Sequence, residues 1–328
     1  MHASTFLRVA TATGAALAAF AIAGPAAARS SDSQLLSEFQ PVTVFDVDER
    51  LRPAKVNAFI RDSVLERFDG TGWVLVDADP EPDSLPGPGT GVWRLNQGSC
   101  SPTNSLGGLD CYAAAASEAG GGDSVYGRVF RSADAIVLQY WYFYYDNTYS
   151  YAHPASDFIW QAHEGDWEVV NVVLTADGLP VSAGYSQHCL GERRAWDDVP
   201  RSDTHPVVYV AAGSHANYFS AGEHPYDPRC VPLQAQVLLA QLGLPLPRDH
   251  TSEGEVSGPK HDDGDETHIR HFDGGESGWT QFRGFWGELQ YFHAPFVGTV
   301  AFGTSPVGPA YKPIWHDPIA AMAAWPQS

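Results

Sequence analysis

The run AIVLQYWYFYY, residues 135–145, constrains the fold of this chain more than any other feature. It combines β-branched and aromatic side chains without an interrupting glycine or proline. Such residues favour a pleated strand over a helix, so the run predicts a long central strand that ends at Asp146. A polar, tyrosine-rich loop is expected to follow it, up to about residue 162.

The other apolar segments are short and separated by turn-forming residues. The chain contains 24 prolines and 32 glycines. Helices are expected from Pro53, with Val56, Phe59, Ile60 and Val64 on one side, and over 231–244. The pattern predicts a mainly β protein, a β-sandwich of jelly-roll type with a few short helices and long loops. No clean linker divides residues 29–328, which favours one domain. Further strands are expected at 42–47, 72–78, 167–175, 179–188 and 205–213, with closing strands and turns at 282–292 and 304–318.

The first 28 residues have the pattern of a cleavable signal peptide. Arg8 precedes an apolar stretch over 9–23, and three alanines precede Arg29, which predicts cleavage after Ala28. A membrane anchor is disfavoured because Thr11, Gly14 and Pro25 weaken the stretch and no basic cluster follows it. No later segment is apolar enough to span a bilayer. The expected location is therefore extracellular or in the cell envelope.

The charge of the chain limits its partners. With 39 acidic and 19 basic residues, the formal net charge is −20. Such a chain repels phosphate backbones and anionic lipid, which argues against nucleic acid and leaves cations and neutral polar ligands. Nine acidic residues fall within 249–276, where we expect a solvated acidic loop. A calcium loop is the alternative, but DDGDE lacks the spacing of an EF-hand.

Four cysteines in an exported chain indicate two disulfides. Three pairings are possible, and we favour Cys100 with Cys111 and Cys189 with Cys230. The first would close a loop rich in serine and glycine. The second would join the loop after one strand to the loop after GSHANYF.

The segment HEGDWE, residues 163–168, is chemically unusual. If a strand starts near Gly165, Asp166 and Glu168 project from one face and Trp167 from the other, with the two Cα atoms roughly 6–7 Å apart. Two enclosed carboxylates repel each other unless a cation or an arginine neutralises them. A divalent ion would meet that need.

Two more side chains are expected near this carboxylate pair. His163 lies just before the predicted strand, and Asp146 lies where the aromatic strand is expected to end. The resulting set of oxygen and nitrogen donors suits Mg²⁺ or Ca²⁺ best, with Mn²⁺ or Zn²⁺ as further options. The alternative is a surface strand whose acids face water. The candidate metal ligands are Asp146, His163, Asp166 and Glu168.

A second polar segment follows the apolar strand at 205–213, in the sequence GSHANYF. Strand ends that turn into small and polar residues commonly present functional groups. His215 could be a ligand, a residue that orients a ligand, or a general base, and it could equally be a structural histidine. No GxSxG pattern surrounds Ser214, which argues against a serine nucleophile.

Several segments in this order resemble the vacuolar protein sorting-associated protein 62 family, whose activity is not established. The similarity spans nearly the whole chain after the signal peptide, and HEGDWE with GSHANYF is its most specific part. The matching segments are FQPVTVFDVDERLRP, AIVLQYWYFYYD, HEGDWE, HPVVYVAAGSHANYF, GFWGE and SPVGPAYKPIWHDP.

The central part more distantly resembles the necrosis- and ethylene-inducing-like proteins, which are secreted cytolysins with a β-sandwich fold. Their GHRHDWE motif lies beside an exposed divalent cation. That resemblance implies ligand roles for Asp146, His163, Asp166 and Glu168. In this chain Glu164 and Gly165 replace the arginine and second histidine of the motif, and the preceding loop is expected to be longer. Cytolysis is accordingly not carried over.

These features lead to three functional hypotheses. The first is a secreted binding protein in which a divalent ion helps to recognise a glycan or glycolipid headgroup. The second is a metal-dependent hydrolase of phosphoesters or glycosides, with His215 or Glu164 as general base. The third is a structural module of the cell envelope in which HEGDWE holds loops together. The candidate ligand-binding residues are Trp160, Tyr149, Tyr151, His215 and Asn217.

Overall fold

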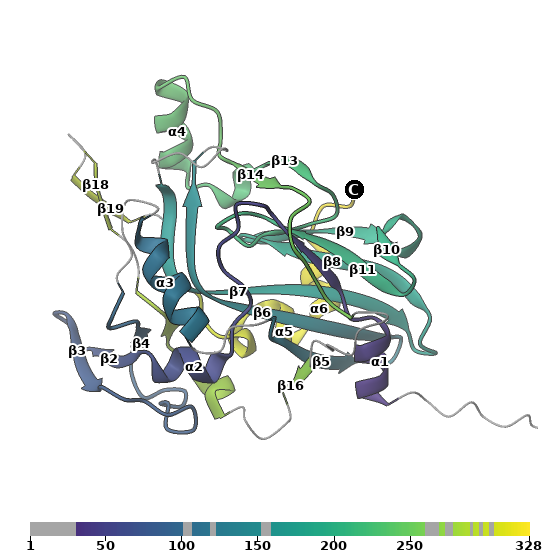
Figure 1. The fold of residues 1–328 in the computed structure, drawn as a ribbon, viewed down its shortest axis with the longest axis horizontal. Helices are drawn as coiled ribbons and strands as arrows, with labels where there is room; N and C mark the ends of the chain where they lie inside the picture. Colours follow the sequence, from purple (N-terminus) through teal and green to yellow (C-terminus); the bar gives the residue numbers. More distant parts are fainter. Residues whose placement is uncertain are drawn as a thin grey trace, which may run out of the picture. The chain divides into compact units, whose positions relative to one another are not determined.

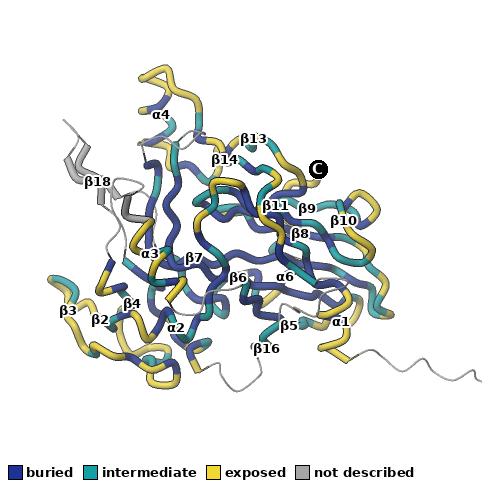
Figure 2. Tube along the Cα trace, viewed as in Figure 1, coloured by how far each residue is buried: buried dark blue, intermediate teal, exposed yellow. Residues whose placement is uncertain are grey.

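A long antiparallel hairpin, formed by β6 (Ala135–Ser150) and β7 (Ile159–Thr175), runs through the middle of the fold (Figure 1). The strands pair from Ala135 opposite Thr175 to Ser150 opposite Ile159. Both are buried along most of their length (Figure 2). The aromatic run therefore forms a central strand, as predicted. The structure is a computed structural model that describes residues 31–328 except 101–106, 119–122, 152–158, 260–268, 273–277, 289–290, 295–297 and 302–304.

This hairpin corrects the predicted strand boundaries. Asp146 is not at a strand end but inside β6, opposite Glu164 of β7. The ladder continues through Asn147 opposite His163, so the described residues of the expected loop, 147–151 and 159–162, are strand except for Tyr151. HEGDWE consequently lies in the middle of β7, where its backbone is paired on the β6 side.

The hairpin belongs to a six-stranded sheet in which neighbouring strands mostly follow each other along the chain. The order is β16-β5-β6-β7-β8-β9, antiparallel throughout except for the parallel edge strand β16. The other strands are β5 (Val125–Arg131), β8 (Pro180–Gln187), β9 (Leu190–Ala195) and β16 (Ile269–His271).

A second sheet packs on the first. Val208, Val210 and Phe45 from this sheet share one hydrophobic core with Val170 and Tyr185 of the large sheet. The mainly β class with packed sheets and short helices is therefore confirmed. The order is β10-β11-β1-β15, with β12 also paired to β11. The strands are β1 (Val42–Phe45), β10 (Arg201–Ser202), β11 (His205–Val210), β12 (Asn217–Tyr218) and β15 (Val256–Ser257).

Smaller sheets and short helices complete the described part of Ser31–Ser328, which is one compact unit. None of the described helices is long and apolar enough to cross a membrane. The remaining strands are β2 (Val64–Phe68), β3 (Trp73–Asp77), β4 (Trp93–Asn96), β13 (Gly222–Pro225), β14 (Arg248–Thr251), β17 (Phe285–Trp286), β18 (Tyr291–Ala294) and β19 (Gly298–Ala301). The helices are α1 (Asp32–Glu38), α2 (Val56–Arg61), α3 (Gly107–Glu118), α4 (Leu233–Gln241), α5 (Pro313–His316) and α6 (Pro318–Ala323).

Three local predictions differ from the structure or lie outside the described residues. The helix expected from Pro53 begins only at Val56 and ends at Arg61, and Val64 starts β2 instead of extending the helix. The region 249–276 contains strands β14, β15 and β16 among its described residues, and its first acid, Asp249, is fully buried rather than solvated. The predicted signal peptide, residues 1–28, lies outside the described residues.

Both expected disulfides are present. Cys100 bonds to Cys111, which lies in α3, and Cys189 bonds to Cys230. The second bond joins the turn after β8 to the segment that leads into α4. The residues on either side of that bond are thereby held close together across 41 positions of sequence.

Candidate functional site

A pocket of about 310 Å³ opens beside HEGDWE, and we call it the HEGDWE pocket. Its volume is at the lower end of the roughly 300–1,000 Å³ typical of small-molecule sites. Its walls come from β6, β7, the turn after β8, the segment before α4 and the C-terminal segment. The lining residues are Asn147, Trp160, Gln161, His163, Asp166, Trp167, Glu168, His188, Cys189, Tyr226, Cys230, Pro232, Pro306 and Lys312.

Gly165 determines which side chains of HEGDWE reach this pocket. Its φ is +61°, and a Cβ placed there would lie 1.9 Å from the backbone oxygen of Trp286. Only glycine combines that left-handed backbone with so close an approach. Strict alternation would put His163 and Asp166 on opposite faces. Because the backbone turns at Gly165, both line the pocket, together with Glu168.

A buried ion-pair cluster around His215 lies behind Asp166, one of the lining residues of the pocket. The ring of His215 stacks on Tyr144, with centroids 3.8 Å apart and planes 5° apart. Its Nδ1 lies 3.0 Å from Oδ2 of Asp166, and its Nε2 lies 3.5 Å from Oε1 of Glu49. Burial alone would lower the pKa of His215, but the two carboxylates raise it to about 10. His215 is therefore protonated at neutral pH.

The turn that carries His215 is fixed by its backbone. Gly213 has a φ of +73°, and a Cβ there would lie 2.2 Å from the carbonyl oxygen of Thr148. The Gly213 amide also donates to Oε2 of Glu49 at 2.7 Å. His215 itself has a φ of +55°, and its amide donates to the Ala211 carbonyl. The small residues of the GSHANYF motif thus bring the imidazole to Asp166.

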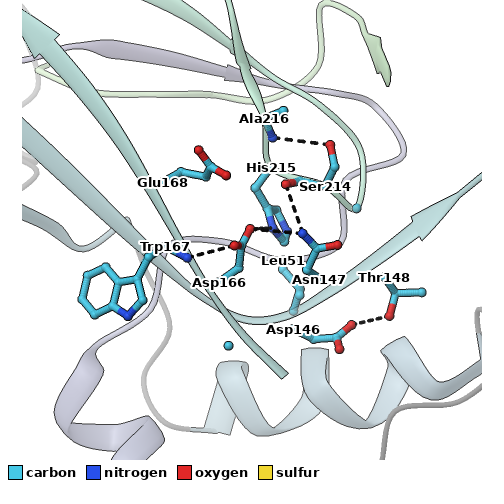
Figure 3. Close-up of polar contacts among 12 residues, drawn as sticks. Leu51, Asp146, Asn147, Thr148, Asp166, Trp167, Glu168, Ser214, His215 and Ala216 are labelled. Carbon is cyan, nitrogen blue, oxygen red and sulfur yellow. Dashed lines mark hydrogen bonds and ion pairs between the residues drawn. The ribbon is translucent and has the colours of Figure 1, made fainter. Parts of the chain in front are cut away.

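The two pocket carboxylates are buried in different surroundings. Asp166 accepts from the Trp167 amide at 2.9 Å and from His215, and Asn147 approaches it (Figure 3). Burial alone would raise the pKa of Asp166, but its bond to His215 and nearby positive charge lower it. Glu168 accepts a bond from Ser186, and burial followed by repulsion from Asp166 raises its pKa to about 8. Glu168 is therefore the harder of the two to ionise, and the nearby charge of Lys312 favours its carboxylate form.

His163 lines the pocket as a neutral imidazole. Its Nδ1 lies 2.8 Å from the carbonyl oxygen of Gly165, so Nδ1 carries the proton. Burial lowers its pKa, which keeps the ring neutral near pH 7. Its Nε2 has no hydrogen-bond partner among the residues that the structure describes. This nitrogen can accept a hydrogen bond or coordinate a metal ion.

Sequence reasoning missed a second imidazole, His188, on another wall of the pocket. Its Nε2 lies 2.5 Å from Oδ2 of Asp249, and its ring stacks on Tyr226 at 3.8 Å. Asp249 also accepts from the hydroxyls of Ser214 and Tyr218. Burial would raise the pKa of Asp249, but His188 and these hydroxyls lower it, so the carboxylate stays ionised. The only signal in the sequence is that His188 directly precedes Cys189.

Sequence reasoning also missed Lys312, although it lies within the quoted segment SPVGPAYKPIWHDP. Lys312 lines the pocket, and its ammonium donates to the carbonyl oxygen of Trp167 at 2.7 Å. Burial lowers the pKa of Lys312, and the charges of Glu168 and Asp166 oppose that effect. A basic residue more than 140 positions away thus contributes to the HEGDWE site.

Asp146 and Glu164 lie outside the pocket lining. The Oδ1 atom of Asp146 accepts from Thr148 at 2.5 Å, and Figure 3 shows this carboxylate directed away from Asp166. Burial raises its pKa to about 7. Glu164 accepts from the amides of Gln97 and Glu288 and from the Tyr112 hydroxyl, which joins three segments. This role of Glu164 agrees with the third hypothesis, in which HEGDWE holds loops together, for this residue of the motif.

The predicted ligand-binding residues are similarly divided. Trp160 lines the pocket, whereas Tyr149 packs behind it in a small apolar cluster with Tyr226. Tyr151 contacts Trp160 and donates to the Pro245 carbonyl. His215 and Asn217 are fully buried and do not line the pocket. His215 and Glu164, the two candidate general bases, are therefore not in contact with the pocket space.

The predicted metal set fits this arrangement only in part. His163, Asp166 and Glu168 line one pocket, but Asp146 does not. Over the described ranges, no three histidine, cysteine, aspartate or glutamate side chains converge as they would around a metal ion. Both oxygens of Asp166 already accept protein hydrogen bonds, and Lys312 supplies a positive charge. The side chains as they stand do not form a coordination shell.

Comparisons with known proteins place the chain in no family. No family model and no curated protein matches it. The structure of necrosis and ethylene inducing protein 2, from the causal agent of cocoa's witches' broom disease, is 14% identical over 74% of this chain and 76% of that chain. The non-toxic HaNLP3 protein is 17% identical over 58% of this chain and 70% of that chain.

Both of these structures are necrosis- and ethylene-inducing-like proteins, the group that the sequence resembles more distantly. Each aligns with a TM-score of 0.32, which is too low to transfer a site or an activity. The resemblance to the vacuolar protein sorting-associated protein 62 family has no support in these comparisons.

Proposed function

We propose that this is a secreted binding protein that takes a hydroxyl-rich ligand, the headgroup of a glycan or glycolipid, in the HEGDWE pocket. The observation that carries the proposal is the lining of that pocket. Carboxylates and an imidazole nitrogen can accept from sugar hydroxyls, the Lys312 ammonium can donate to them, and Trp160 offers an aromatic surface. A few polar groups within aromatic walls are typical of small-ligand sites. The two disulfides suit an oxidising compartment.

The divalent cation predicted from the sequence stays a prediction. If Mg²⁺, Ca²⁺, Mn²⁺ or Zn²⁺ binds, His163, Asp166 and Glu168 are the residues that line the pocket and carry suitable donor atoms. Asp146 would have to change its hydrogen bond to Thr148 to join them. Glycan recognition by the pocket does not require that change.

Immobilised neutral and acidic glycans, together with glycosphingolipid headgroups, provide the test. We expect the purified protein to bind at least one of them, and Glu168→Gln or Trp160→Ala to weaken binding about tenfold or more, as expected for losing a charged hydrogen bond or a stacking surface. Glu223→Gln is the matched control because Glu223 lies in β13, outside the pocket lining. Binding that is equally strong in all three variants would contradict the proposal.

A second candidate, a hydrolase, is favoured by one observation. His188 is held by the Asp249 carboxylate and lines the pocket, which is the arrangement of an oriented general base. The bases suggested by the sequence, His215 and Glu164, do not line it. Turnover of a phosphodiester or glycoside that His188→Ala abolishes would support hydrolysis. Binding without turnover over the same panel would leave recognition as the function.

A further inference from the structure

The two carboxylates in the HEGDWE pocket need positive charge. Asp166 and Glu168 are only 6% and 5% exposed. Removing a carboxylate from water is costly unless an opposite charge and hydrogen bonds replace the solvent. His215 bonds to Asp166 from behind the pocket, but only Ser186 donates a side-chain hydrogen bond to Glu168 among the described residues. The question is which cation balances this pair.

We propose that Lys312 is the built-in cation of the HEGDWE pocket, so that its ammonium takes the place of a divalent ion and the pocket binds its ligand without metal. The inference uses the same pocket as the proposed function, but its first test needs no glycan.

The position of Lys312 supports this role. Its Nζ donates to the carbonyl oxygen of Trp167, the residue between the two acids, at 2.7 Å. Three basic side chains lower the pKa of Asp166 through their charge: His163, His215 and Lys312. Two of them, Lys312 and His215, also lower the pKa of Glu168. Lys312 is the one member of this set that both lines the pocket and ends in an ammonium group.

The backbone around Lys312 is fixed, so the ammonium is not a passing surface charge. A 3-10 turn at Pro309–Tyr311 precedes it, and α5 follows it. The α5 carbonyl of Trp315 accepts from Arg128 at 2.6 Å, and that of Ile314 accepts from Gln139 at 3.0 Å. These bonds to β5 and β6 dock the segment on the large sheet and hold Lys312 at the pocket.

The chemistry of the site follows from this arrangement. An ammonium has three donors, and only the Trp167 carbonyl accepts from Lys312 among the described residues. The remaining donors and the nearby carboxylate acceptors together match a hydroxyl, which both accepts and donates. A divalent ion would instead meet a fixed positive charge beside ligands that already accept hydrogen bonds.

Calorimetric titration with Mg²⁺, Ca²⁺, Mn²⁺ and Zn²⁺ tests the proposal. We expect no stoichiometric binding by the wild-type protein after dialysis against EDTA. Lys312→Met, which keeps the side-chain length without the charge, should gain one site that the further change Glu168→Gln removes. Lys312→Arg keeps the charge and should gain none. One divalent ion bound per wild-type chain and lost in Asp166→Asn, or no gain in Lys312→Met, would overturn the proposal.

A second measurement does not depend on the folding of a variant. The melting temperature of the wild-type protein should be the same in EDTA and in each of the four ions. A rise in melting temperature with one ion that EDTA reverses would refute the role of Lys312. Glycan binding is then repeated in EDTA. Undiminished binding supports the proposal, and metal-dependent binding contradicts it. Failure of every glycan to bind counts against the proposed function alone.

Discussion

Replacing Gly165 with alanine should cost about 2–5 kcal/mol of unfolding free energy, for two separable reasons. The first is backbone strain, because a φ of +61° costs a residue with a Cβ about 1–2 kcal/mol. The second is steric. The added Cβ would lie 1.9 Å from the Trp286 oxygen, a backbone atom that cannot rotate away. Moving the two segments apart should add about 1–3 kcal/mol, as for other overpacked sites.

Gly178→Ala separates the two contributions. Gly178 also has a positive φ, +89°, but a Cβ there would have no atom within 4 Å. It should therefore lose only the strain. Urea unfolding followed by tryptophan fluorescence, with linear extrapolation to water, measures both variants.

The comparison gives a direct refutation. Equal losses in the two variants would show that the contact between Gly165 and Trp286 does not constrain the fold. Where Gly165→Ala still folds, His163 and Asp166 should be displaced from the pocket, and glycan binding should weaken with stability. Gly178→Ala should leave binding unchanged, because Gly178 does not line the pocket.

Three further predictions concern buried charge and the disulfide. Burial raises the pKa of Glu164 to about 8, so the wild type should lose stability as pH rises from about 4.5 to about 8, at about 1.4 kcal/mol per pKa unit. Urea unfolding at pH 5, 7 and 9 should show the unfolding free energy of Glu164→Gln rising relative to that of the wild type. The difference between Glu223→Gln and the wild type should stay constant. His215→Ala strands two buried carboxylates and should cost about 3–5 kcal/mol at pH 7. Because the folded pKa of His215 is about 10, that gap should be full below about pH 6.5 and shrink towards pH 10, and a constant gap would contradict the ion pairs. Replacing Cys189 and Cys230 with serine should lower the unfolding free energy, measured by calorimetry, by about 3–4 kcal/mol and weaken glycan binding. The same loss of stability with unchanged binding would show that the disulfide is not needed for the shape of the pocket.

The sequence was informative wherever local pattern decides structure. The aromatic run does form the central strand, the segment 231–244 contains α4, and both cysteine pairs were identified. Strand alternation also placed Asp166 and Glu168 beside one pocket, because Trp167 between them packs its ring into the core. These outcomes depend on neighbouring residues, whose effects a single sequence displays.

The full set of pocket residues was harder to predict from the sequence, because it depends on backbone conformation and on distant segments. The left-handed turn at Gly165 redirects His163, and no strand pattern reveals the sign of φ at a glycine. Asp146 was expected at a strand end, but β6 continues beyond it. Lys312 and His188 reach the pocket from other parts of the chain, and their positions follow from the docking of α5 and from the bond to Asp249.

The position of the pocket on the central hairpin has a consequence for changing its specificity. Asp166 in its lining is tied to the structural framework, because it is hydrogen-bonded to His215, which forms an ion pair with Glu49. Ligand preference should therefore vary in evolution or in a designed library mainly through Gln161, Pro232 and Pro306, which line the pocket without joining that cluster. Randomising these three positions should yield folded proteins with new preferences, whereas randomising Asp166, His215 and Glu49 should mostly yield insoluble chains.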